Sequence, residues 1–173
     1  RRLLREFGDT PQALRDLSVS LNNIGDVTLA ERGPAAALPL YEESLEVRRR
    51  LLHEFGDTPQ ALRDLSVSLE RVGDVQASAE QSDPAAEGFG EALATYRRLI
   101  EEFGGEAEDR WRVRVPLFRL AVLAGEAGDA AKGLGYLREA LEHVEAVRER
   151  WGALPEVERS REAIRNLISQ IES

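Results

Sequence analysis

The chain has 173 residues, of which 42% are hydrophobic and 32% are charged, and its formal net charge is −9. This composition supplies enough apolar side chains for a packed core and argues against wholesale disorder. The negative charge disfavours nucleic acid and anionic membranes as partners, since both attract positive surfaces. No apolar run is long enough to cross a membrane. The sequence has no cysteine and only two histidines, His53 and His143, so we expect no disulfide, no metal site and no cofactor.

The first predicted helix covers 10–31. Its apolar residues follow one another at steps of three and four, which is the spacing of one helix face rather than the alternation of a strand. Thr10 followed by Pro11 predicts the helix start, because a hydroxyl can cap free backbone N–H groups and proline fits the first helical position. We expect a single packed face formed by Leu14, Leu17, Leu21, Ile24 and Val27.

The second predicted helix covers 34–55. Gly33 and Pro34 interrupt the first helix, and Gly56 predicts the end of the second, because glycine enters the left-handed region at little cost. The linker is short, so the two helices should run antiparallel. The arginines at 48–50 have glutamates at helical spacing, which predicts surface ion pairs.

This pair of helices recurs every 48 residues. Segments 1–27 and 49–75 differ at only four of 27 positions, and a third copy of the start begins at Arg97. Such a period predicts a repeat array, in which each unit packs on its neighbours. The remaining helices are expected over 58–80, 84–103, 107–127, 129–151 and 155–172, after a helix end over 1–7. The four exchanges are Arg5/His53, Asn22/Glu70, Asn23/Arg71 and Ile24/Val72.

One stretch is ambiguous. Residues 111–116 alternate like a strand and end in Pro116, which removes a helical hydrogen bond. The repeat register predicts a helix with a kink or a restart at Pro116, and a short extended stretch is the alternative.

The repeated unit resembles the tetratricopeptide repeat family, in a long-helix variant with a 48-residue unit. The motif positions that carry the resemblance recur three times, including small residues that let paired helices approach. The resemblance implies an all-α fold, a right-handed α-solenoid of antiparallel helical hairpins. We expect one array over 1–173, with 1–8 as the end of a preceding helix, repeats at 10–56, 58–104 and 107–152, and an extra or capping helix at 155–172. The motif positions are Leu21, Ile24-Gly25, Ala37, Tyr41 and Ser44-Leu45, then Leu69, Val72-Gly73, Ala85, Phe89 and Ala92-Leu93, then Leu117, Leu120-Ala121, Gly133, Leu137 and Ala140-Leu141.

In that family the first helices line a concave groove that binds peptides or partner helices. The near-identical first and second units differ mainly at groove positions, so these positions are candidates for specificity, although ordinary surface drift explains the differences equally well. The mixed charge suits a partner with basic and apolar groups. The predicted groove residues are Asn22, Asn23, Asp26, Glu70, Arg71, Asp74, Phe118, Arg119 and Val122.

Catalysis has little support in the sequence. His53 is expected at the surface, because its equivalents are Arg5 and Glu101. The glycines around Phe89 and Leu134 lack the rest of a phosphate loop and are read as packing positions.

The sequence therefore predicts a non-enzymatic, cytoplasmic interaction scaffold that binds a protein or peptide, as a fragment of a larger bacterial protein. Two alternatives remain. The array is a sensor or oligomerisation arm that regulates an attached effector domain, such as an ATPase or a caspase-like protease, or it is an enzyme that uses carboxylates in the groove. Self-association through exposed array ends is also possible.

Overall fold

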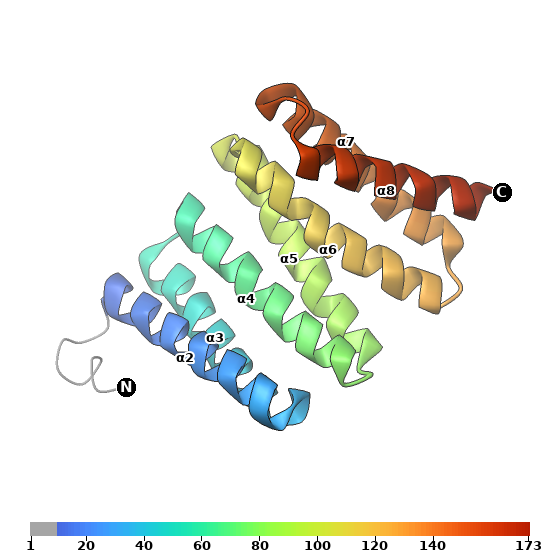
Figure 1. The fold of residues 1–173 in the computed structure, drawn as a ribbon. Helices are drawn as coiled ribbons and strands as arrows, with labels where there is room; N and C mark the ends of the chain where they lie inside the picture. Colours follow the sequence, from blue (N-terminus) through green and yellow to red (C-terminus); the bar gives the residue numbers. More distant parts are fainter. Residues whose placement is uncertain (1–9) are drawn as a thin grey trace. The chain divides into compact units, whose positions relative to one another are not determined.

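A computed structural model describes residues 10–173, and this part of the chain is helical throughout, without a strand (Figure 1). The all-α prediction is confirmed, and every predicted helix is present to within about two residues at each end. The helix end predicted over 1–7 lies outside the described residues. The helices are α2 (Pro11–Arg32), α3 (Pro34–Phe55), α4 (Pro59–Ser78), α5 (Ser82–Phe103), α6 (Ala107–Glu126), α7 (Ala130–Trp151) and α8 (Pro155–Glu172).

The chain divides into two compact units, Arg1–Thr95 and Tyr96–Ser173, with α5 contributing to both. In the first unit, α3 packs against both α2 and α4. In the second unit, α7 packs against both α6 and α8. Each unit thus consists of helices that pack on their neighbours in sequence, which is the solenoid-like order of consecutive helix pairs that the repeat predicted.

Capping residues fix where the helices begin and end. The Thr10 and Thr58 hydroxyls each accept a hydrogen bond from the backbone N–H three residues later, at 3.1 Å. Gly56 ends α3 with φ 81°, a conformation that a side chain would strain. These contacts confirm the helix start that Thr10 and Pro11 predicted and the helix end that Gly56 predicted.

The helix α6 continues through Pro116. It runs without interruption from Ala107 to Glu126, so the restart and the extended stretch considered for 111–116 are both wrong. The proline removes one backbone hydrogen bond. Burial of Val113, Leu117 and Leu120 on the same helix offsets that loss.

Small residues let the paired helices approach closely, as predicted. A Cβ atom built on Gly25 would lie 2.8 Å from the Tyr41 ring, and one on Gly73 would lie 2.8 Å from the Phe89 ring. In the third pair Ala121 and Leu137, both buried, replace the glycine and the ring. The extra methyl group of Ala121 is thus compensated by Leu137, which is smaller than the aromatic side chains at the equivalent positions of the first two pairs.

The packed face predicted for α2 is partly wrong. Leu14 and Leu21 are buried, but Ile24 and Val27 are 53% and 56% exposed. The face that meets α3 instead includes Ser18 and Gly25, because α3 covers the side of α2 with residues at steps of three and four from Leu14.

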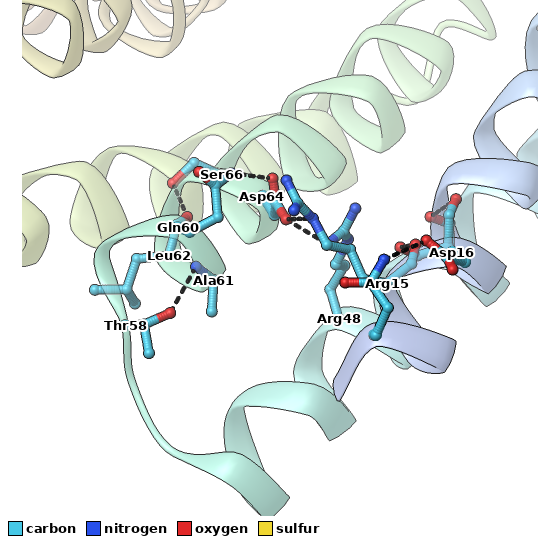
Figure 2. Close-up of polar contacts among 12 residues, drawn as sticks. Arg15, Asp16, Arg48, Thr58, Gln60, Ala61, Leu62, Asp64 and Ser66 are labelled. Atoms are coloured by element: carbon cyan, nitrogen blue, oxygen red, sulfur yellow. Dashed lines mark hydrogen bonds and ion pairs between the residues drawn. The ribbon is translucent and has the colours of Figure 1, made fainter. Parts of the chain in front are cut away.

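An ion-pair cluster that includes the buried Arg48 joins α2, α3 and α4 (Figure 2). The Asp64 carboxylate accepts hydrogen bonds from Arg48 at 2.5 Å and from Arg15 at 3.0 Å. Arg48 is buried, so its prediction as a surface residue is wrong; Arg49 and Arg50 do form the predicted pairs with Glu46 and Glu54. Burial lowers the pKa of the Arg48 guanidinium, the Asp64 charge raises it, and the Arg15 charge lowers it further.

Candidate partner-binding surfaces

In the first unit, four of the predicted groove residues line one hollow. The hollow has a volume of about 340 Å³ and lies between α2 and α4, above the Tyr41 ring of α3. The predicted residues Asp26, Glu70, Arg71 and Asp74 line it, together with Leu29, Val67 and Val75.

Asp26 is the centre of a polar network in this hollow. Its carboxylate accepts a hydrogen bond from the Tyr41 hydroxyl at 2.7 Å and forms an ion pair with Arg71. The Arg71 guanidinium lies 5.9 Å from the centre of the Tyr41 ring, within range of a cation–π interaction. Burial, followed by the Asp26 hydrogen bond and charge, raises the pKa of Tyr41 to about 12, although Arg71 opposes this shift. Three helices therefore contribute one residue each to a fixed polar surface.

The network gives two predicted specificity residues a structural role. Arg71 is one of the exchanges between the near-identical repeats, where the first repeat has Asn23. In the structure Arg71 ties α4 to Asp26 of α2, so the exchange also provides a contact between consecutive helix pairs. Asn23 is exposed and Asn22 is half-buried, and neither lines the hollow.

In the second unit, an apolar hollow lies between α6 and α8. Its volume is about 220 Å³, and the predicted residues Phe118 and Arg119 line it. Val122 lies on the same helix, outside the hollow. Phe118 and Val122 are 39% and 43% exposed, so α6 presents two large apolar side chains at the surface. The remaining lining residues are Arg114, Val115, Ser160, Ala163 and Ile164.

Sequence reasoning missed the contribution of α8 and the position of Arg114. A signal for α8 was present, because Ala163 is the 48-residue equivalent of Val115, which lies three residues before the predicted groove residue Phe118. Arg114 had no such signal. Its guanidinium lies 3.7 Å from the centre of the Trp111 ring and donates to the Trp111 carbonyl oxygen at 2.8 Å, which fixes its direction. Trp111 in turn contacts Trp151, with ring centres 6.4 Å apart, although Trp151 remains 36% exposed.

The residues weighed for catalysis occupy separate places. His53 is exposed near the end of α3. His143 is half-buried in α7, where burial lowers the pKa of its imidazole, although Glu139 and Glu142 act in the opposite direction. The glycines beside Phe89 and Leu134 lie inside helices. A Cβ on Gly88 or on Gly133 would contact a backbone carbonyl oxygen of the neighbouring helix, at 3.6 and 3.4 Å, as expected of packing positions. A Cβ on Gly90 or on Gly135 would meet no atom within 4 Å, so the packing interpretation is wrong for these two.

Residues 10–173 contain no group of three or more side chains that could hold a metal ion together. None of the helices in this range combines the length and apolar character needed to span a membrane.

Comparison with known proteins gave structural likenesses alone. No family model matches the sequence, and no curated protein matches it. The chain is similar to the de novo designed helical repeat protein DHR64, with 17% identity over 99% of this chain and 87% of the other, at a TM-score of 0.42. It is also similar to the DHF58 filament, with 19% identity over 94% and 79% of the two chains and a TM-score of 0.38. The DHF79 filament gives 18% identity over 95% and 90% at a TM-score of 0.36.

Proposed function

We propose that this chain is a protein-interaction scaffold, a long-helix relative of the tetratricopeptide repeat family, that binds a peptide or a partner helix against its first helices. The observation that carries the proposal is the apolar hollow beside Phe118 in the second unit. Large apolar side chains exposed around a concave surface mark interaction sites more often than chance exposure does. The motif positions of the family, repeated three times at a fixed offset, support the relationship.

The size of the hollow favours a peptide side chain as its occupant. Pockets for small molecules usually measure about 300–1,000 Å³ and enclose most of the ligand. The hollow between α6 and α8 measures about 220 Å³, which suits one or two apolar side chains of a longer partner. Val115, Ala163 and Ile164 provide the apolar contacts, and Arg119 provides charge at the rim.

The two hollows suggest a partner of mixed character. The hollow of the first unit contains three carboxylates and one arginine, which favours basic or hydrogen-bonding groups. The hollow of the second unit favours apolar groups. A partner that has both basic and apolar groups, as expected from the sequence, would bind favourably at either hollow, so neither hollow needs to provide all of the binding energy.

The test is a pair of phenylalanine substitutions in the intact protein. Phe118→Ser removes the exposed ring from the hollow, whereas Phe103→Ser removes a ring of similar exposure, 42%, at the end of α5. Partners captured by the unchanged protein are purified and titrated against both variants. We expect Phe118→Ser to weaken binding by about ten-fold or more, or ~1.4 kcal/mol, because buried aromatic contacts dominate interfaces.

Phe103→Ser should bind like the unchanged protein. Circular dichroism of both variants verifies that helicity is retained. Equal affinities of the two variants for every captured partner would remove the hollow between α6 and α8 from the proposed function.

A further inference from the structure

The helices α2 and α4 are near copies that have different surroundings. Residues 10–21 and 58–69 are identical in sequence. At about 100° per residue, four positions of each helix fall within an arc of roughly 100°. The groove positions Asn23 and Arg71 lie next to this arc, and Val75 of the α4 arc also lines the hollow of the first unit. The arc comprises Asp16, Ser20, Ile24 and Val27 on α2 and their equivalents Asp64, Ser68, Val72 and Val75 on α4.

On α4 this arc is covered by the preceding helix pair. Val72 and Val75 are 5% and 3% exposed and belong to one apolar cluster with Tyr41 and Leu45 of α3. Ser68 is also buried. The arc of α4 is therefore the surface by which a second helix pair packs on the first.

On α2 the same arc is open. Ile24 and Val27 occupy the positions of Val72 and Val75, yet more than half of each side chain is exposed. Ser20 is exposed as well. Two large apolar residues at packing positions of a repeat are the signature of an interface that needs a neighbour.

The charged position of the arc shows the same relationship. The Asp64 carboxylate accepts a hydrogen bond from Gln60 of its own helix at 2.8 Å, and it also accepts hydrogen bonds from Arg15 and Arg48 of the preceding pair. Asp16 accepts Gln12 in the same way, at 2.7 Å. Within residues 10–173, the hydrogen bond from Gln12 is the contact that the Asp16 side chain makes. The two arginine contacts that Asp64 receives from the preceding helix pair therefore have no equivalent at Asp16 in this part of the chain.

The sequence ahead of α2 identifies the kind of helix pair that fits. Residues 1–9 repeat residues 49–57 with a single exchange, Arg5 for His53. In the repeat, 49–57 is the segment that leads from a second helix into the next first helix. The local sequence before α2 is thus the one that precedes α4.

We propose that the face of α2 formed by Asp16, Ile24 and Val27 docks a further helix pair of this repeat, joined ahead of α2 in the same polypeptide. The docking pair supplies apolar residues in the places of Tyr41 and Leu45. It also supplies a guanidinium to Asp16, as Arg48 does to Asp64. The docking face of α2, formed by Asp16, Ile24 and Val27, contains none of the residues that line the proposed partner-binding hollows. Its test measures folding stability rather than partner binding, so the two proposals are tested separately.

The test extends the chain by a copy of residues 10–48 placed directly before Arg1, which restores the 48-residue period. We expect the midpoint of thermal unfolding to rise by about 5 °C or more. The amides of α2 should exchange with deuterium at least about ten-fold more slowly than in the original chain. Ile24→Glu should lower the midpoint of the extended protein and leave that of the original chain within about 1 °C, since the residue is exposed there.

Asp16→Asn provides the matched ionic control. It should destabilise the extended protein and have almost no effect on the stability of the original chain. In the extended protein, replacing the copied Arg48 by alanine together with Asp16→Asn should cost less stability than the sum of the two single changes, because both remove the same ion pair. An extension that adds no helix, or one that adds helix without protecting α2, overturns the proposal. So does a dimer of the original chain that Ile24→Glu converts to a monomer, because a second copy would then cover the face.

Discussion

At the scale of single residues, the closest contacts between paired helices depend on a glycine opposite a ring. Gly25 meets Tyr41 and Gly73 meets Phe89, and in each pair a Cβ atom would fall within 3.0 Å of the ring. The Tyr41 ring cannot move aside easily, because it is buried and its hydroxyl is bound to Asp26. The sequence motif predicted these pairs correctly, since the size complementarity lies within one repeat.

We predict that Gly25→Ala lowers the free energy of unfolding by about 1 kcal/mol. Overpacking against the Tyr41 ring costs about 1–3 kcal/mol, and the higher helix propensity of alanine returns up to about 1 kcal/mol. Thermal and denaturant unfolding measure the difference.

The control is Gly135→Ala in α7. A Cβ on Gly135 meets no atom within 4 Å, so this variant should gain about 0.5–1 kcal/mol from helix propensity alone. Stabilisation of similar size by both variants would show that the contact between Gly25 and Tyr41 is not tight.

At the scale of helices, α8 is attached to α7 by both apolar and ionic contacts. Val157 and Ile164 are buried, whereas arginine and glutamate residues form pairs around them. Glu158 pairs with Arg148, and Glu145 accepts Arg161 and Arg165, each at 2.7 Å. The hydrogen bond from Arg148 lowers the pKa of Glu158 below its usual value of 4.5, with the Arg148 and Arg161 charges acting in the same direction.

This arrangement predicts that α8 loosens in acid. A carboxylate whose pKa is lower in the folded state stabilises it above the unfolded value, and the contribution is lost as the pH falls through the folded pKa. Amide exchange in α8 should therefore accelerate relative to α7 as the pH falls below 4.5. Glu158→Gln should remove part of this pH dependence, and an unchanged profile in that variant would contradict the role of Glu158.

The helix boundaries could be predicted from sequence, but contacts between helix pairs could not. Caps such as Thr58 and Gly56 act on the adjacent backbone, so their effect is visible in a few consecutive residues. Arg48 was expected at the surface because its partner, Asp64, lies in the next helix pair and at no helical spacing from it. Helix periodicity gives the side on which Asp26, Arg71 and Asp74 lie, and they line one hollow, whereas Asn22 and Asn23 do not. The position of Arg114 depends on a ring contact that periodicity does not encode.

At the scale of the whole molecule, one ion pair recurs with the repeat. Arg49 pairs with Glu91 at 2.6 Å in the first unit, and Arg97 pairs with Glu139 at 2.6 Å in the second. Both arginines and both glutamates are 48 residues apart, and each pair connects successive second helices. The pairs are partly exposed, so solvent screens their charges and each pair contributes little to stability.

We predict that Arg49→Gln and Arg97→Gln each cost less than about 1 kcal/mol of the free energy of unfolding, and less still at high salt. The neighbouring Arg48→Gln is the control. It removes the buried one of the two arginines that bind Asp64 and should cost about 2 kcal/mol, because a buried hydrogen bond between charged groups is lost. Equal costs for Arg48→Gln and Arg49→Gln would contradict the distinction between the buried and the exposed arginine.

The identity of residues 10–21 and 58–69 also affects how the chain refolds. During collapse from denaturant, α3 meets two helices whose first three turns are chemically the same. Only their later turns, which carry the exchanges Asn22/Glu70, Asn23/Arg71 and Ile24/Val72, distinguish the correct neighbour on each side. A chain in which α3 packs on the wrong one of these two helices, or on the wrong side, must break that contact before it reaches the native state. The near-perfect duplication therefore introduces a kinetic trap in folding.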